Sequence, residues 1–84
     1  MNTTVQVLFF GAAREIAGEA EIDFALPNNA KAAEAFEIIL EKFPTLREKF
    51  GKSLLFAVNQ NYANGDETIR NNDELAVFPP VSGG

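Results

Sequence analysis

Apolar residues recur at helical spacing through one segment of the chain, and this segment limits the possible folds. Ala32, Phe36, Ile39, Leu40 and Phe43 lie on one face of a helix, and the charged residues between them fall on the other face. Such an apolar stripe must be buried against another element. The chain therefore needs a partner surface for one helix, and its other apolar segments must supply that surface.

The ends of this helix follow from its flanking residues. Asn28 or Asn29 has the side chain of a good N-cap. Phe43 precedes Pro44, and a residue before proline is pushed out of the helical region. We therefore expect one helix of about fourteen residues that ends at Phe43. Residues 45–50 fit one further turn that stops at Gly51.

Most of the remaining chain has strand-like patterns. Alternating apolar residues, or a continuous apolar run, predict five strands. The predicted strands span residues 4–10, 21–26, 54–58, 67–70 and 74–78, with Ile69 pointing inward from the fourth. Residues 12–20 read as the loop of an antiparallel hairpin, and Asn71-Asn72-Asp73 reads as a turn.

One helix packed across a mixed sheet of about five strands is an α+β fold. If the first and last strands lie side by side in parallel, the topology is that of a ubiquitin-like β-grasp. We expect one β-grasp domain over residues 1–78. Pro79 and Pro80 cannot continue a central strand, so residues 79–84 are expected to form a flexible tail.

Composition limits what the chain does by itself. It contains no His and no Cys, so it has no side chain that titrates near neutral pH, no thiol nucleophile and no soft metal ligand. We expect neither a self-contained catalytic site nor a metal site. The net charge of −5 disfavours nucleic acid and acidic membranes and favours a basic protein surface. The absence of cysteine and of a leader or membrane-spanning pattern predicts a cytoplasmic protein.

The last residues draw attention to the chain end. Gly83 and Gly84 have no Cβ, so their backbone can enter a slot that any side chain would block. Because the chain has neither His nor Cys, the α-carboxylate of Gly84 is the best candidate for chemistry. The alternative is that the Pro-Pro step merely ends the sheet and the last residues fray.

Several motifs form a pattern that covers nearly the whole chain. They are Leu8-Phe9-Phe10-Gly11, Arg14-Glu15 with Gly18, Val58-Asn59-Gln60, and the run Asp73-Glu74-Leu75-Ala76-Val77-Phe78-Pro79-Pro80-Val81-Ser82-Gly83-Gly84. This pattern resembles the MoaD family, the small sulfur-carrier subunits of molybdopterin synthase. The resemblance also implies the β-grasp topology.

The resemblance implies a chemistry for Gly84. A carboxylate with a pKa of about 3.5 is ionised at neutral pH and is a poor acyl electrophile. In the family, a MoeB-like enzyme uses ATP to adenylate the terminal glycine, and a sulfur donor protein converts the adenylate to a thiocarboxylate. A MoaE-like large subunit then supplies the site where the pterin precursor takes up sulfur. The implied assembly is a heterotetramer, and no cofactor binds the small subunit itself.

The tail residues have physical roles under this interpretation. Pro79 and Pro80 hold an extended stem at low entropic cost. Val81 and Ser82 set the register of the tail in a partner's channel. Gly83 lets that channel stay narrow.

An interaction patch is predicted on the sheet. Phe10 and Phe78 have the parity opposite to their buried neighbours, so both rings are expected on the face away from the helix, with Tyr62 nearby. We expect the large subunit to dock there; the alternative is that a loop or the tail covers the patch. Arg14 and Glu15 are expected in the first loop, either in contact with a partner or as a weak salt bridge.

Three other functions remain open on the residues alone. A thiamin-pathway sulfur carrier of the ThiS type also ends in Gly-Gly, although the Phe-Pro-Pro-Val stem speaks against it. A ubiquitin-like modifier would attach Gly84 to lysines of target proteins. A plain interaction module would leave the tail idle.

Overall fold

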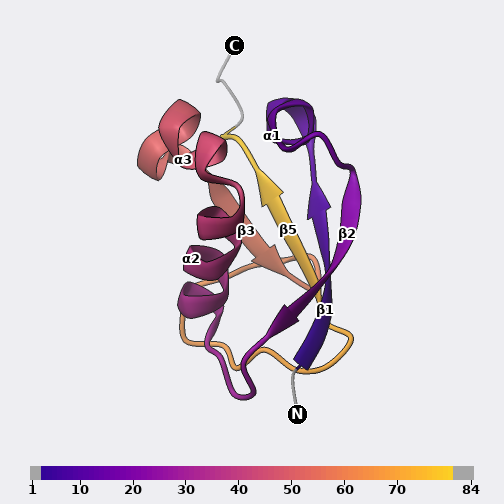
Figure 1. Ribbon diagram of the computed structural model, residues 1–84. Coiled ribbons are helices and arrows are strands. Elements are labelled where there is room, and N and C mark those ends of the chain that lie inside the picture. The colour runs from indigo at the N-terminus through magenta and orange to yellow at the C-terminus, as the bar shows by residue number, and fades with distance from the viewer. Residues whose placement is uncertain (1–2, 81–84) are drawn as a thin grey trace.

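A mixed five-stranded sheet forms the body of the protein, with strand order β2-β1-β5-β3-β4 (Figure 1). The computed structural model describes residues 3–80. The elements are β1 (Thr3–Phe9), α1 (Gly11–Ala17), β2 (Glu21–Leu26), α2 (Ala32–Lys42), α3 (Pro44–Phe50), the 3₁₀ turn η1 (Gly51–Ser53), β3 (Leu55–Val58), β4 (Asn61–Tyr62) and β5 (Glu74–Phe78).

The first and last strands lie side by side at the centre of this sheet. β1 runs parallel to β5, with Val7 opposite Leu75, and antiparallel to β2. β5 is also antiparallel to β3, which pairs with the short β4. The α+β class and the parallel pairing of the terminal strands are thus confirmed. This is the topology of a ubiquitin-like β-grasp.

The core lies between one face of the sheet and the helices. Alternate residues of β1 and β5 point to this face because side chains alternate along a strand. The buried residues of the two strands are Val5, Val7, Phe9, Leu75 and Val77, and those of α2 are Ala32, Ala35, Ile39 and Leu40. Two aromatic contacts join the layers: Phe9 meets Phe43 edge-on at 5.0 Å between ring centroids, and Phe36 stacks on Phe56 at 4.7 Å.

The start of α2 differs from the prediction. The helix has 11 residues and begins after Lys31, whose N–H donates to the Glu34 carboxylate at 3.0 Å. Asn29 instead has a positive φ of 65°, and Asn28 accepts a hydrogen bond from the Thr3 hydroxyl. The two asparagines therefore form the turn before the helix rather than its cap. The predicted end holds, since Phe43 has left the helical region.

The turn expected after Pro44 is confirmed as α3, which has Pro44 in its first turn and Gly51 at its C-cap. Proline suits this position because the first N–H groups of a helix have no helical partner.

Two expectations for the smaller elements are wrong. Residues 11–17 form the helix α1, which takes up most of the segment 12–20 that was predicted as a hairpin loop. Ala13 is fully buried there, so tertiary packing stabilises a helix too short to show a clear period. The fifth strand is β4, at 61–62, and not the segment 67–70. Ile69 does point inward, but its N–H donates to Ala30 O and Thr68 makes only an isolated bridge with Lys31.

Candidate functional site

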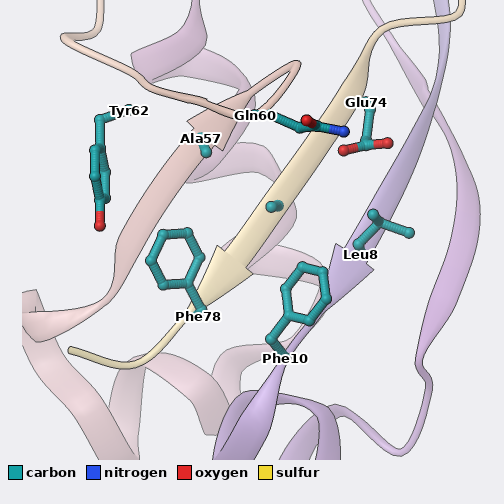
Figure 2. A pocket seen from close by; sticks show the side chains of 8 residues that line it. Leu8, Phe10, Ala57, Gln60, Tyr62, Glu74 and Phe78 are labelled. Atoms are coloured by element: carbon teal, nitrogen blue, oxygen red, sulfur yellow. The ribbon is translucent and has the colours of Figure 1, made fainter. Parts of the chain in front are cut away.

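A groove is hollowed into the sheet face opposite α2 (Figure 2). Its volume is about 600 Å³, and its lining residues are Leu8, Phe10, Ala57, Gln60, Tyr62, Glu74, Ala76 and Phe78. We call this feature the sheet groove. Its strand residues have the parity opposite to the core residues, which is why they emerge on this face.

The strand register explains why the face is hollow. Leu8 lies opposite Ala76, Ala76 opposite Ala57, and Ala57 opposite Tyr62, so one row of side chains crosses four strands. The two alanines in the middle of this row are small and form a floor, 8% and 7% exposed. The larger side chains at the ends of the row stand up as walls.

Aromatic rings surround one end of the sheet groove. Phe10 is 49% exposed and Tyr62 is 71% exposed, while Phe78 is half-buried between them. The centroids of the Tyr62 and Phe78 rings are 5.9 Å apart. Figure 2 shows Phe10 and Phe78 at the same end of the groove. All three predicted residues therefore lie on the expected face, and within residues 3–80 Phe10 and Tyr62 are the large apolar side chains that stay exposed.

The opposite end of the sheet groove is polar and is built by a tight turn. Asn59 and Gln60 connect β3 to β4, and both have positive φ, 51° and 73°, as a two-residue hairpin of type I′ requires. Asn59 accepts a hydrogen bond from the Glu74 N–H and donates one to the Asp73 carboxylate, each at 3.0 Å. This turn therefore places Gln60 beside Glu74.

Several lining residues were not predicted as site residues. Leu8 and Ala76 share the parity of Phe10 and Phe78, so the alternation already contained the signal that they lie on the same face. Glu74 also has this parity, so the alternation placed it on the same face. Gln60 carried no such signal, because only the strand pairing brings its turn beside the start of β5.

The base of the predicted tail lies beside the aromatic end of the sheet groove. β5 ends at Phe78, and the half-buried Pro79 follows directly. Gly11 has a φ of 56°, and a Cβ at this position would lie 3.6 Å from the Pro79 ring, so the start of α1 approaches the stem closely. Pro80 is exposed. The predictions for Val81, Ser82, Gly83 and Gly84 lie outside the described residues.

Arg14 and Glu15 are exposed on α1 and not in a loop as expected. No ion pair joins them; within residues 3–80 the single ion pair is that of Arg47 with Glu37. The salt-bridge alternative therefore has no support, and a role in partner contact stays a prediction.

The carboxylates of Glu67 and Asp73 stabilise turns. Glu67 accepts hydrogen bonds from the N–H groups of Asn64 and Gly65, at 2.9 and 3.0 Å. Backbone hydrogen bonds, first that of Asn64, hold the pKa of Glu67 below its ordinary value of 4.5. Asp73 accepts from the Arg70 N–H at 2.8 Å. These carboxylates are used by the backbone rather than directed at a shared substrate.

No group of three or more acidic, His or Cys side chains is arranged to hold a metal ion within residues 3–80. No helix in this range is long and apolar enough to cross a membrane.

Comparison with known proteins places the fold and this site in context. The model of the ThiS family matches residues 7–84. The "Molybdopterin synthase sulfur carrier subunit" of Caenorhabditis briggsae is 43% identical over 83 residues, which cover 96% of this chain and 98% of that protein. The family match includes the residues of the sheet groove and those of the tail.

Solved structures agree with this placement. SAMP1 of Haloferax volcanii superposes with a TM-score of 0.83 at 25% identity, covering 96% of this chain and 99% of that one. A chain from the complex of subunits 1 and 2 of the molybdopterin-converting factor of Helicobacter pylori has a TM-score of 0.65 at 29% identity, covering 98% of this chain and all of that one. The chain described here therefore belongs to the ThiS family and groups with relatives named molybdopterin synthase sulfur carrier subunits.

Proposed function

We propose that this protein is the sulfur carrier subunit of a molybdopterin synthase, a subunit that donates sulfur and has no catalytic site of its own. The observation that carries the proposal is the near full-length match to relatives with this name, one of them 43% identical. The composition agrees, because a chain without His or Cys has no side chain suited to catalyse sulfur transfer by itself.

The position of β5 supports a carrier role for the tail. This strand lies at the centre of the sheet, between β1 and β3, and the chain passes from it directly into Pro79 and Pro80. A stem that starts from the most rigid part of a fold and has fixed φ angles loses little entropy when it enters a partner. We expect Val81, Ser82 and Gly83 to lie in that partner's channel.

The proposed reaction takes place at Gly84. An oxygen of its α-carboxylate attacks the α-phosphorus of ATP in the active site of a MoeB-like enzyme, and pyrophosphate leaves. A sulfur donor protein then delivers sulfur at the oxidation level of sulfide, which attacks the acyl carbon. The C–O bond to AMP breaks, AMP leaves, and a thiocarboxylate remains. The sulfur is delivered to the pterin precursor, and hydrolysis returns Gly84 to a carboxylate.

The sheet groove is the proposed docking site for the large subunit. A chain similar to this one occurs in a complex of subunits 1 and 2 of a molybdopterin-converting factor. Exposed aromatic side chains around a hollow of about 600 Å³ are the type of surface on which binding energy concentrates. The groove also adjoins Pro79, so a partner held there is beside the stem of the tail.

The intact mass of the protein tests the sulfur chemistry. The chain is co-expressed with an adenylating enzyme and a sulfur source from an organism that makes molybdopterin. We expect the mass increase of one oxygen exchanged for sulfur. The chain that lacks Gly84 is the control: it must keep its thermal stability and show no increase. An unchanged mass in the full chain under conditions that load a known carrier would contradict the proposal.

A modifier function is the second candidate, because a structural neighbour is the small archaeal modifier protein SAMP1. A modifier would form isopeptide bonds between Gly84 and lysines of other proteins. Tryptic digestion of cell extracts, followed by a search for lysines that carry residues 71–84 as a branch, separates the two functions, because Arg70 is the last basic residue of the chain. Adducts that disappear when Gly84 is deleted would favour the modifier.

The ThiS-type alternative is tested by complementation. In cells that lack both native carriers, the chain is expected to restore molybdenum-cofactor formation and not thiamin synthesis. Rescue of thiamin synthesis alone would favour the alternative.

A further inference from the structure

Asn64 is followed by Gly65, and this is the only Asn-Gly step in the sequence. Glycine has no side chain to shield its nitrogen, so asparagine before glycine is especially prone to deamidation. In that reaction the Gly65 nitrogen loses its proton and attacks Cγ of Asn64. An N–Cγ bond forms, the Cγ–Nδ2 bond breaks, and the amide nitrogen leaves as ammonia with the displaced proton. Water then opens the succinimide ring to aspartate or isoaspartate.

The loop around this step binds the reacting atoms closely. One carboxylate oxygen of Glu67 accepts the Gly65 N–H at 3.0 Å, and the other accepts the Asn64 N–H at 2.9 Å. The Asp66 N–H donates to the side-chain oxygen of Asn64 at 3.0 Å. The nucleophile and the carbonyl that it must attack are therefore both held by hydrogen bonds.

The loop is also fixed to the body of the protein. The Ala33 N–H donates to Gly65 O at 3.1 Å, and the Ala32 N–H donates to Glu67 O at 2.7 Å. These bonds attach the loop to the first turn of α2. Gly65 has a φ of 104°, a backbone conformation that other residues rarely adopt, so the geometry depends on the glycine that makes the step reactive.

We propose that the Glu67 carboxylate slows the deamidation of Asn64. The reactive species is the deprotonated Gly65 nitrogen, and its proton is donated to a negative oxygen. Loss of that proton would leave two negative atoms in contact, which the charge-assisted hydrogen bond disfavours. The second bond, to Asn64, holds the loop so that ring closure requires both bonds to Glu67 to change.

The titration of Glu67 agrees with this role. Hydrogen bonds from the backbone lower the pKa of its carboxyl group, so the group is ionised throughout the neutral range in which deamidation occurs. The ionised carboxylate therefore slows deamidation under physiological conditions.

Deamidation at Asn64 would alter the shape of the sheet groove. Tyr62, a wall of the groove, precedes Asn64 by two residues, and the Ala63 N–H between them donates to Phe56 O at 3.0 Å. An isoaspartate adds a backbone carbon at position 64. The added length is incompatible with the present bonds to α2, and Tyr62 is the nearest groove residue affected.

The test compares the wild type with Glu67→Gln, which keeps the shape of the side chain and removes its charge. Both proteins are incubated at mildly alkaline pH, and isoaspartate and aspartate at position 64 are quantified by peptide mapping. We expect deamidation to be about tenfold faster in Glu67→Gln, as the loss of a charge-assisted hydrogen bond predicts. Asp66→Asn is the matched control: it removes a neighbouring charge, leaves both bonds to Glu67, and is expected to match the wild type.

A second measurement does not depend on the fold of the variant. Wild-type protein in concentrated urea is expected to deamidate at Asn64 much faster than native protein, and wild type and Glu67→Gln are expected to become equal there. Equal rates in the native state would overturn the proposal. Slower deamidation in native Glu67→Gln than in the native wild type would also overturn the proposal, since Glu67 would then be acting as a base that speeds the reaction. A native wild type that reacts as fast as the urea-unfolded chain would also refute it.

Discussion

Phe9 and Phe10 are neighbours in the chain, yet they lie on opposite faces of the sheet. Phe9 is 1% exposed in the core, and Phe10 is 49% exposed in the sheet groove. Phe10 also occupies the N-cap position of α1, with extended backbone and no side-chain cap. Adjacent residues of one type therefore have separate roles, and substitutions can distinguish them.

Phe10→Asp is expected to fold as well as the wild type, because aspartate is a preferred N-cap and offsets the lost contacts by up to about 1 kcal/mol. Its affinity for the large subunit should fall by at least about tenfold, as for a residue at the centre of an interface. Thermal unfolding and calorimetric titration measure the two effects. Phe9→Ala is the comparison and should lose about 3–5 kcal/mol of stability. If Phe10→Asp bound normally, the proposed docking surface would be wrong.

Glu67 makes stability depend on pH in a defined direction. Its pKa is lowered from 4.5 in the folded state, so its contribution is complete above 4.5 and is lost as the pH falls through the folded value. The free energies of unfolding of wild type and Glu67→Gln should therefore differ by a constant amount at neutral pH and converge in acid. Urea titrations over a pH series measure this difference. A difference that stayed constant into acid would show that the ionised carboxylate is not responsible.

At the scale of elements, the sheet groove forms because small side chains lie in the middle of one row of opposed residues across β1, β5, β3 and β4. Ala76 and Ala57 form its floor between Leu8 and Tyr62. The parity of Phe10 and Phe78 was readable in the chain, since side chains alternate along any strand. The sequence did not show which residues of different strands lie opposite one another, because the pairing of the strands sets this register.

Ala76→Leu is expected to fill the sheet groove without disturbing the core, because position 76 points away from α2. Binding of the large subunit should weaken by tenfold or more, and the unfolding temperature should change by only a few degrees. Ala25→Leu is the matched control, since Ala25 is exposed on β2 opposite Thr4 and lies outside the groove. Equal affinity of the two variants would remove the groove from the interface.

The smaller elements show where local patterns are weak. α1 and β4 were not predicted, and both are short, 7 and 2 residues. A helix of this length is not stable alone and depends on burial of Ala13. β4 exists because the turn at Asn59 and Gln60 returns the chain to β3. Their formation depends on tertiary contacts, which a single window of sequence does not contain.

At the scale of the whole molecule, the net charge of −5 acts on association. An acidic carrier is steered toward a basic partner, and salt screens this attraction as the Debye length falls from about 30 Å at 0.01 M to about 3 Å at 1 M. The association rate with the large subunit should therefore fall as salt is raised, while the dissociation rate changes little. Stopped-flow measurements separate the two rates. An association rate that did not respond to salt would exclude electrostatic steering.

The sequence by itself determined the α+β class, the position of the main helix, the inward faces of the first and last strands and the lack of His and Cys. These properties depend on periodicity and composition, which are local. The tertiary structure decided that β1 lies in parallel beside β5, that small side chains meet in one row to hollow the groove, and that Asn59 joins its turn to Glu74. Each of these joins residues far apart in the chain, and only the packed sheet brings them within contact distance.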